Sequence, residues 1–90
     1  MPPFQPHRRI YGGSIDYDSQ PRKWVKTHNF ASRDWIESQV RYGEWIKDRN
    51  SQNGFVIYAT NIDGTKPVTI LIKITFLETH ILVYHVHLLR

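Results

Sequence analysis

Two histidines near the end of the chain have a spacing that can support chemistry. His85 and His87 are separated by one residue within a run of largely apolar residues. Alternate residues of a β-strand point to the same side, so both imidazoles are expected on one face, with about 7 Å between their Cα atoms. Three interpretations are open for this pair: a structural role without function, a metal site, or proton transfer near neutral pH.

A metal site would need more than these two side chains. A catalytic zinc usually has three protein ligands, which carboxylates in turn hold in position. His28 and His80 are the candidates for a third ligand, but acidic residues are scarce near the pair. We therefore assign neither a metal nor another cofactor to the chain.

Proton transfer by histidines would suit cleavage of RNA without a metal. One group takes the proton of the 2′-hydroxyl, a second protonates the leaving 5′-oxygen, and cations stabilise the charge on the phosphorus centre. Histidine fits both proton roles, and arginine or lysine fits the third. The residues expected to be catalytic are His28, His85 and His87, and the expected phosphate-binding cations include Lys26, Arg33 and Lys73.

The positive charge of the chain is concentrated in its first third. Residues 1–33 contain six basic and two acidic side chains, a net charge of +4, whereas residues 34–90 contain six of each and are neutral. Such asymmetry is typical of proteins that bind nucleic acid or another polyanion, although a solvated basic surface gives the same pattern. Tyr11, Tyr17 and Trp24 lie among these basic residues and are candidates to stack on bases. For Trp24, the apolar periodicity favours the core.

The elements that would position these residues follow from local patterns. We expect one domain over residues 1–90, with a flexible basic arm over residues 1–14 because of its prolines and glycines. A helix is expected that has Pro21 in its first turn and continues through residues 22–28. A second helix should begin after the N-cap Ser32 and end at Gly43. Its buried stripe would contain Trp35, Ile36 and Val40.

After Gly43 the apolar pattern changes to the two-residue period of β-strands. Strands are expected over residues 44–47, 55–61, 67–76 and 79–89, with a hairpin turn at Asp63-Gly64. These strands would form an antiparallel meander that needs a helix to cover one face. The predicted fold is therefore α+β, with one or two N-terminal helices packed on a small antiparallel sheet of three or four strands.

Strict alternation also predicts which side chains meet the helices. In the strand over residues 67–76, the core row is Val68, Ile70, Ile72, Ile74 and Phe76, and Lys73 is on the opposite face. In the last strand, the predicted core row is Leu82, Tyr84, Val86 and Leu88. The exposed face would then contain Lys73, His85 and His87.

Composition excludes several classes of protein. No apolar run approaches the ~20 residues of a membrane-spanning helix, and the N-terminus lacks the apolar stretch of a signal peptide. The chain has no cysteine, so it forms no disulfide framework. We expect a cytoplasmic protein that does not associate with membranes.

The stretch over residues 15–32 resembles the opening of BrnT-type toxins. In that family an aromatic-Asp pair precedes a helix that carries a lysine, followed by a basic residue close to a histidine and then a capped helix. Here Tyr17-Asp18, Lys23, Lys26 and His28 match these elements. The remaining helix and hairpin resemble the same superfamily, which includes the RelE-like ribonucleases, so the similarity extends over roughly residues 15–90.

The resemblance implies a metal-independent endoribonuclease toxin on an α+β scaffold, with RNA as substrate and an antitoxin protein as inhibitor. It adds Lys23 to the expected phosphate-binding residues. Family members end in an arginine-rich segment, for which only Arg90 could substitute here. The alternative is a module without catalytic activity that binds nucleic acid, or that pairs an exposed strand edge with a partner protein.

Overall fold

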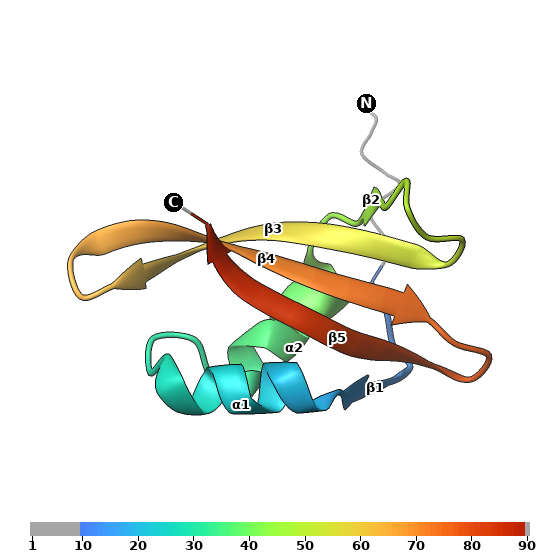
Figure 1. Ribbon diagram of the computed structural model, residues 1–90, viewed down its shortest axis with the longest axis horizontal. Helices are drawn as coiled ribbons and strands as arrows, with labels where there is room; N and C mark the ends of the chain where they lie inside the picture. Colours follow the sequence, from blue (N-terminus) through green and yellow to red (C-terminus); the bar gives the residue numbers. More distant parts are fainter. Residues whose placement is uncertain (1–9, 90) are drawn as a thin grey trace.

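Two helices cover one face of a five-stranded sheet. The computed structural model describes residues 10–89, in which the elements are β1 (Ser14–Tyr17), α1 (Ser19–Thr27), α2 (Arg33–Tyr42), β2 (Ile46–Lys47), β3 (Gly54–Asp63), β4 (Lys66–Phe76) and β5 (His80–Leu89). The strands lie in the order β1-β5-β4-β3-β2, and both helices lie on the same side of the sheet (Figure 1). The predicted α+β class is confirmed. Residues 1–9 of the predicted arm and Arg90 lie outside the described residues.

The sheet is mixed rather than purely antiparallel. Strands β2 to β5 form the predicted antiparallel meander, and Gly64 in the β3–β4 turn has the positive φ of 67° that favours glycine. Strand β1 pairs with β5 in parallel, from Ser14 opposite His80 to Tyr17 opposite Val83. Both helices and three strands lie between these two partners in the chain, so local patterns do not indicate this pairing. Within residues 10–89, neither helix is long and apolar enough to cross a membrane.

Side-chain caps set where the helices begin. The Asp18 carboxylate accepts a hydrogen bond from the backbone N–H of Ser19, so α1 begins at Ser19 and Pro21 lies in its first turn, as predicted. The Ser32 hydroxyl accepts from the N–H of Trp35, and α2 ends at Gly43, both as predicted. The helices bury Trp24, Ile36 and Val40 against the sheet. On β4, Ile70, Ile72 and Ile74 are almost fully buried, which confirms the centre of the predicted core row.

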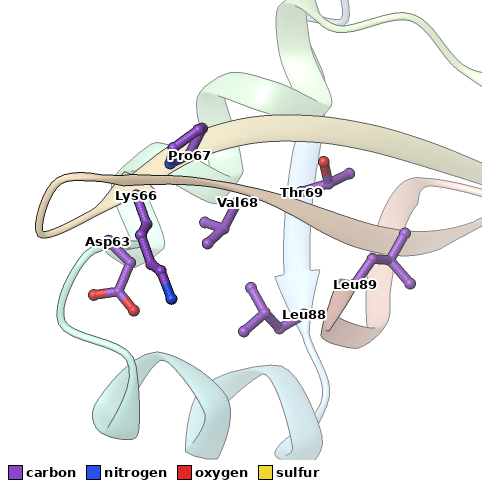
Figure 2. Close-up of a pocket in the computed structure, with 7 residues that line it drawn as sticks. All are labelled: Asp63, Lys66, Pro67, Val68, Thr69, Leu88 and Leu89. Carbon is purple, nitrogen blue, oxygen red and sulfur yellow. The ribbon is translucent and has the colours of Figure 1, made fainter.

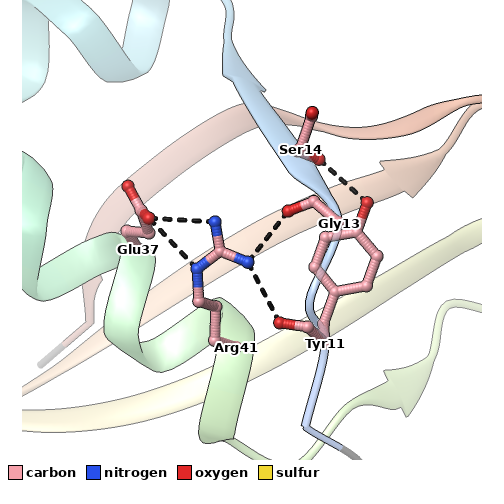
Figure 3. Close-up of polar contacts among 5 residues, drawn as sticks. All are labelled: Tyr11, Gly13, Ser14, Glu37 and Arg41. Carbon is pink, nitrogen blue, oxygen red and sulfur yellow. Dashed lines mark hydrogen bonds and ion pairs between the residues drawn. The ribbon is translucent and has the colours of Figure 1, made fainter.

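Arg41 holds the segment that leads into β1 (Figure 3). Its guanidinium donates to the backbone oxygens of Tyr11 and Gly13 at 3.0 and 2.8 Å, and it pairs with the Glu37 carboxylate at 3.0 Å. The Tyr11 hydroxyl donates to the backbone oxygen of Ser14 at 2.8 Å. The described end of the predicted arm is therefore attached to α2.

A β-bulge interrupts the last strand. Lys73 is opposite His85 but Ile74 is opposite Val83, so Tyr84 is an extra residue in β5. Val83 and Val86 are both fully buried against the helices, and the two residues between them therefore face away from the core. The predicted core row of this strand is wrong before the bulge. Ile81 and Val83 are buried there instead of Leu82 and Tyr84, because one extra residue reverses the faces.

Gln20 of α1 fixes the strand just after the bulge. Beyond Val83, the outer edge of β5 has no strand partner among residues 10–89. The Gln20 side chain donates to the backbone oxygen of Val86 at 2.7 Å and accepts from its N–H at 2.8 Å. The amide thus replaces a neighbouring strand and satisfies backbone groups that would otherwise lose hydrogen bonds.

The Arg41→Ala substitution should lower the free energy of unfolding by about 1–3 kcal/mol, because it leaves the Tyr11 and Gly13 carbonyls without their donor. Urea denaturation measures this change. The control is Arg49→Ala, which removes an exposed arginine from the turn after β2 and should be close to neutral. Equal effects of the two substitutions would contradict the role of Arg41.

Candidate functional site

The face of the sheet opposite the helices carries two of the three predicted catalytic residues, His85 and His87. We call it the open face, and its central residues are Val56, Tyr58, Leu71, Lys73, Tyr84, His85 and His87. Two cross-strand rows run over β3, β4 and β5: Val56–Lys73–His85 and, beside it, Tyr58–Leu71–His87. The structure therefore confirms that Lys73, His85 and His87 share a face.

His85 and His87 form a hydrogen-bonded pair. Nε2 of His85 lies 2.9 Å from Nδ1 of His87, and the ring centroids are 4.9 Å apart. One ring nitrogen donates and the other accepts, depending on the tautomer. Two rings in direct contact cannot flank one phosphate from opposite sides, so the pair is suited to act as one proton-transfer unit rather than as a separate acid and base.

The environment of His85 favours its neutral form. Burial lowers the pKa of His85 from its ordinary value of 6.5, and the neighbouring charges of His87 and Lys73 lower it further. A neutral imidazole has a free lone pair, which is what a proton acceptor needs.

The bulge brings Tyr84 to the same face. Its pKa is raised, first by burial and then by the negative charge of Asp48, so the phenol keeps its proton near neutral pH. We predicted Tyr84 in the core from strict alternation, and this candidate proton donor was missed. The sequence carries no clear signal for the bulge, because residues 81–89 have apolar side chains on both alternating rows.

His28 lies in the helix layer and not with the other two histidines. It caps the C-terminus of α1, and its ring stacks on Trp24 with 4.0 Å between centroids. Its Nδ1 lies 2.8 Å from the backbone oxygen of Trp24, which is itself part of the core beneath the sheet. The sheet thus separates His28 from the histidines of the open face. The predicted site that shares His28 with His85 or His87 is not assembled.

Among the predicted cations that the structure describes, only Lys73 belongs to the open face. Lys23 and Lys26 are exposed on α1. Arg33, at the start of α2, lies over the ring of Tyr17 at 4.5 Å from the ring centroid. The basic charge of residues 10–33 therefore surrounds the helices, because α1 and α2 pack on the opposite face of the sheet.

The remaining histidine of the described chain joins two strands. Nε2 of His80 lies 3.1 Å from the Asp16 carboxylate on β1, and Nδ1 lies 3.0 Å from the Thr79 hydroxyl. His80 is engaged there, and no cluster of three metal-ligating side chains occurs within residues 10–89.

Most of the aromatic residues proposed to stack on bases are part of the core. Tyr17 and Trp24 are buried, and burial raises the pKa of Tyr17 to about 12. Tyr11 packs against Trp45 and Phe76. Tyr58, which we did not single out, is 55% exposed on the open face and is available to a ligand.

A cavity of about 510 Å³ lies beside the β3–β4 turn, where β5 ends (Figure 2). Its lining is mainly apolar and consists of Asp63, Lys66, Pro67, Val68, Thr69, Leu88 and Leu89. None of these side chains is a proton-transfer group suited to neutral pH, so the cavity is not the candidate site.

Comparisons of the chain with family models, with curated proteins and with solved structures find no match. The resemblance to BrnT-type toxins therefore stays a prediction, and the function must be argued from the open face itself.

The imidazole of His85 should titrate with a midpoint below pH 6.5 in the folded protein. Because folding lowers this pKa, the unfolded chain binds more protons, and the free energy of unfolding falls as the pH drops below about 6.5. NMR titration of the histidine ring signals measures the midpoint. Lys73→Met should raise it, since the substitution removes a nearby positive charge. A midpoint at or above 6.5 would contradict this environment.

Proposed function

We propose that the protein is a metal-independent endoribonuclease and that the open face carries its active site. The observation that supports this most is the hydrogen-bonded His85–His87 pair with Lys73 directly opposite His85. A proton acceptor and a cation thereby lie side by side on a surface that is accessible to a long polyanion.

The proposed reaction assigns one step to each side chain. His85 takes the proton from the 2′-hydroxyl, and the 2′-oxygen attacks the adjacent phosphorus. His87 positions the His85 ring, and Lys73 stabilises the added negative charge on the phosphate oxygens. The bond from phosphorus to the 5′-oxygen breaks, and Tyr84 gives that oxygen its proton. The products are a 2′,3′-cyclic phosphate and a 5′-hydroxyl.

The basic residues of the helix layer have a different role in this proposal. Lys23, Lys26 and Arg33 lie on the other side of the molecule and would attract RNA at long range rather than bind the reacting phosphate. The resemblance to BrnT-type toxins supports a toxin of the cytoplasm that an antitoxin protein holds inactive.

Incubation of purified protein with total RNA in EDTA tests the proposal. The wild-type chain should produce fragments with 2′,3′-cyclic phosphate ends. The His85→Gln variant should lose about 10²–10⁴-fold in cleavage rate, and Tyr84→Phe should also be slow. The matched control is His28→Gln, which changes a histidine of the helix layer and should cleave like the wild type. RNA that stays intact at high protein excess would overturn the enzymatic function.

The exposed ring of Tyr58 favours one alternative, a surface that binds single-stranded RNA without cleaving it. Tyr58→Ala should weaken binding of a 2′-O-methyl RNA, which cannot be cleaved by this route, by roughly 5- to 150-fold in a fluorescence anisotropy assay. The matched control is Tyr42→Ala, because Tyr42 of α2 is also 55% exposed. Equal affinities of the two variants would exclude a stacking role for Tyr58.

A further inference from the structure

We infer that His85 and His87 also form a chelating site for a divalent late transition metal ion, with Cu²⁺ as the preferred ion. Their facing nitrogens, Nε2 of His85 and Nδ1 of His87, are 2.9 Å apart on one face of β5. Imidazole nitrogens are the protein ligands that copper, nickel and zinc share, and a rigid strand keeps both rings in place.

The two facing nitrogens are close enough to bind one ion together. Metal–imidazole bonds are about 2.0–2.1 Å long, so two ligands at a right angle have nitrogens about 2.8–3.0 Å apart. Ligands at the tetrahedral angle would be about 3.3 Å apart. The observed 2.9 Å is the length of the hydrogen bond that joins the two rings, and it is short enough for both nitrogens to bind one ion. Cu²⁺ heads the affinity order of the divalent first-row metals for nitrogen ligands, which makes it the preferred ion. Chelation requires that the ion displace the proton between the two nitrogens and that both rings turn until their lone pairs meet at the ion.

The surroundings limit the affinity of this site. No third protein ligand joins the pair within residues 10–89, so water would occupy the remaining positions. Lys73, opposite His85, places a positive charge beside the ion and weakens its binding. Removal of that charge should therefore strengthen metal binding, although the same change should weaken any contact with RNA phosphates.

Metal binding would have a consequence for catalysis, and this consequence rests on the proposed function. A bound ion would take Nε2 of His85 and break its hydrogen bond with His87, which holds the His85 ring in position for proton transfer. The ion would therefore inhibit RNA cleavage, and a chelator such as EDTA would restore it. The geometry thus connects one histidine pair to two mutually exclusive ligands, a metal ion and a proton.

Titration of the full chain with Cu²⁺, Ni²⁺ and Zn²⁺ in a non-coordinating buffer tests the site. Calorimetry should show that one ion binds per chain and that Cu²⁺ binds most tightly. For Cu²⁺, visible absorption should report the same binding, and this binding should depend on the histidine pair. His85→Ala and His87→Ala should each weaken Cu²⁺ binding by roughly tenfold or more, and Lys73→Met should strengthen it several-fold. The controls are His28→Ala and His80→Ala, which change histidines outside the open face and should leave this affinity unchanged.

The possible results separate this inference from the proposed ribonuclease. Equal Cu²⁺ affinity of the wild type and of either pair variant would overturn the metal site, whether or not RNA is cleaved. Binding that depends on the pair, in a protein that leaves RNA intact, would support the site and contradict the ribonuclease. Cleavage that continues at full rate when Cu²⁺ occupies the pair would overturn the inferred inhibition.

Discussion

The burial of Val83 and Val86 on either side of one extra residue is the constraint on which the open face depends. Both valines must pack against the helices, and the chain between them has one residue more than a regular strand would allow. Tyr84 and His85 are therefore directed to the same side, next to Lys73. Without the bulge, strict alternation would place only one of these two side chains on the open face.

The helix layer stabilises this arrangement from behind. Gln20 binds both backbone groups of Val86, so α1 fixes the strand one residue after His85. Asp18, which caps α1, also donates its backbone N–H to the oxygen of Val83 at 2.9 Å. The residues on both sides of the bulge are thus attached to the start of one helix. The helices therefore contribute to the site by positioning β5, although their own basic side chains lie on the other face.

Much of the fold could be predicted because its signals are local. The N-cap Ser32, the end of α2 at Gly43 and the turn at Asp63-Gly64 each depend on a few neighbouring residues. The alternating row of Ile70, Ile72 and Ile74 indicated which face of β4 is buried. The parallel pairing of β1 with β5 could not be predicted in the same way, because it joins segments more than 60 residues apart.

The site was predicted only in part, for reasons that concern particular residues. His85, His87 and Lys73 share a face because they lie on regular strand positions in adjacent strands. Tyr84 was missed because we assumed regular alternation along the whole last strand, and the bulge breaks that alternation. His28 was placed with the pair on the basis of residue type alone, but the packing of Trp24 beneath the sheet decides its position.

We expect RNA to meet the open face and not the basic helices. NMR chemical shift changes, measured as a 2′-O-methyl RNA is added, test it most directly because they report on every residue at once. The largest changes are expected at five residues of the open face: Tyr58, Lys73, Tyr84, His85 and His87. Largest changes at Lys23, Lys26 and Arg33, with the open face unaffected, would contradict it.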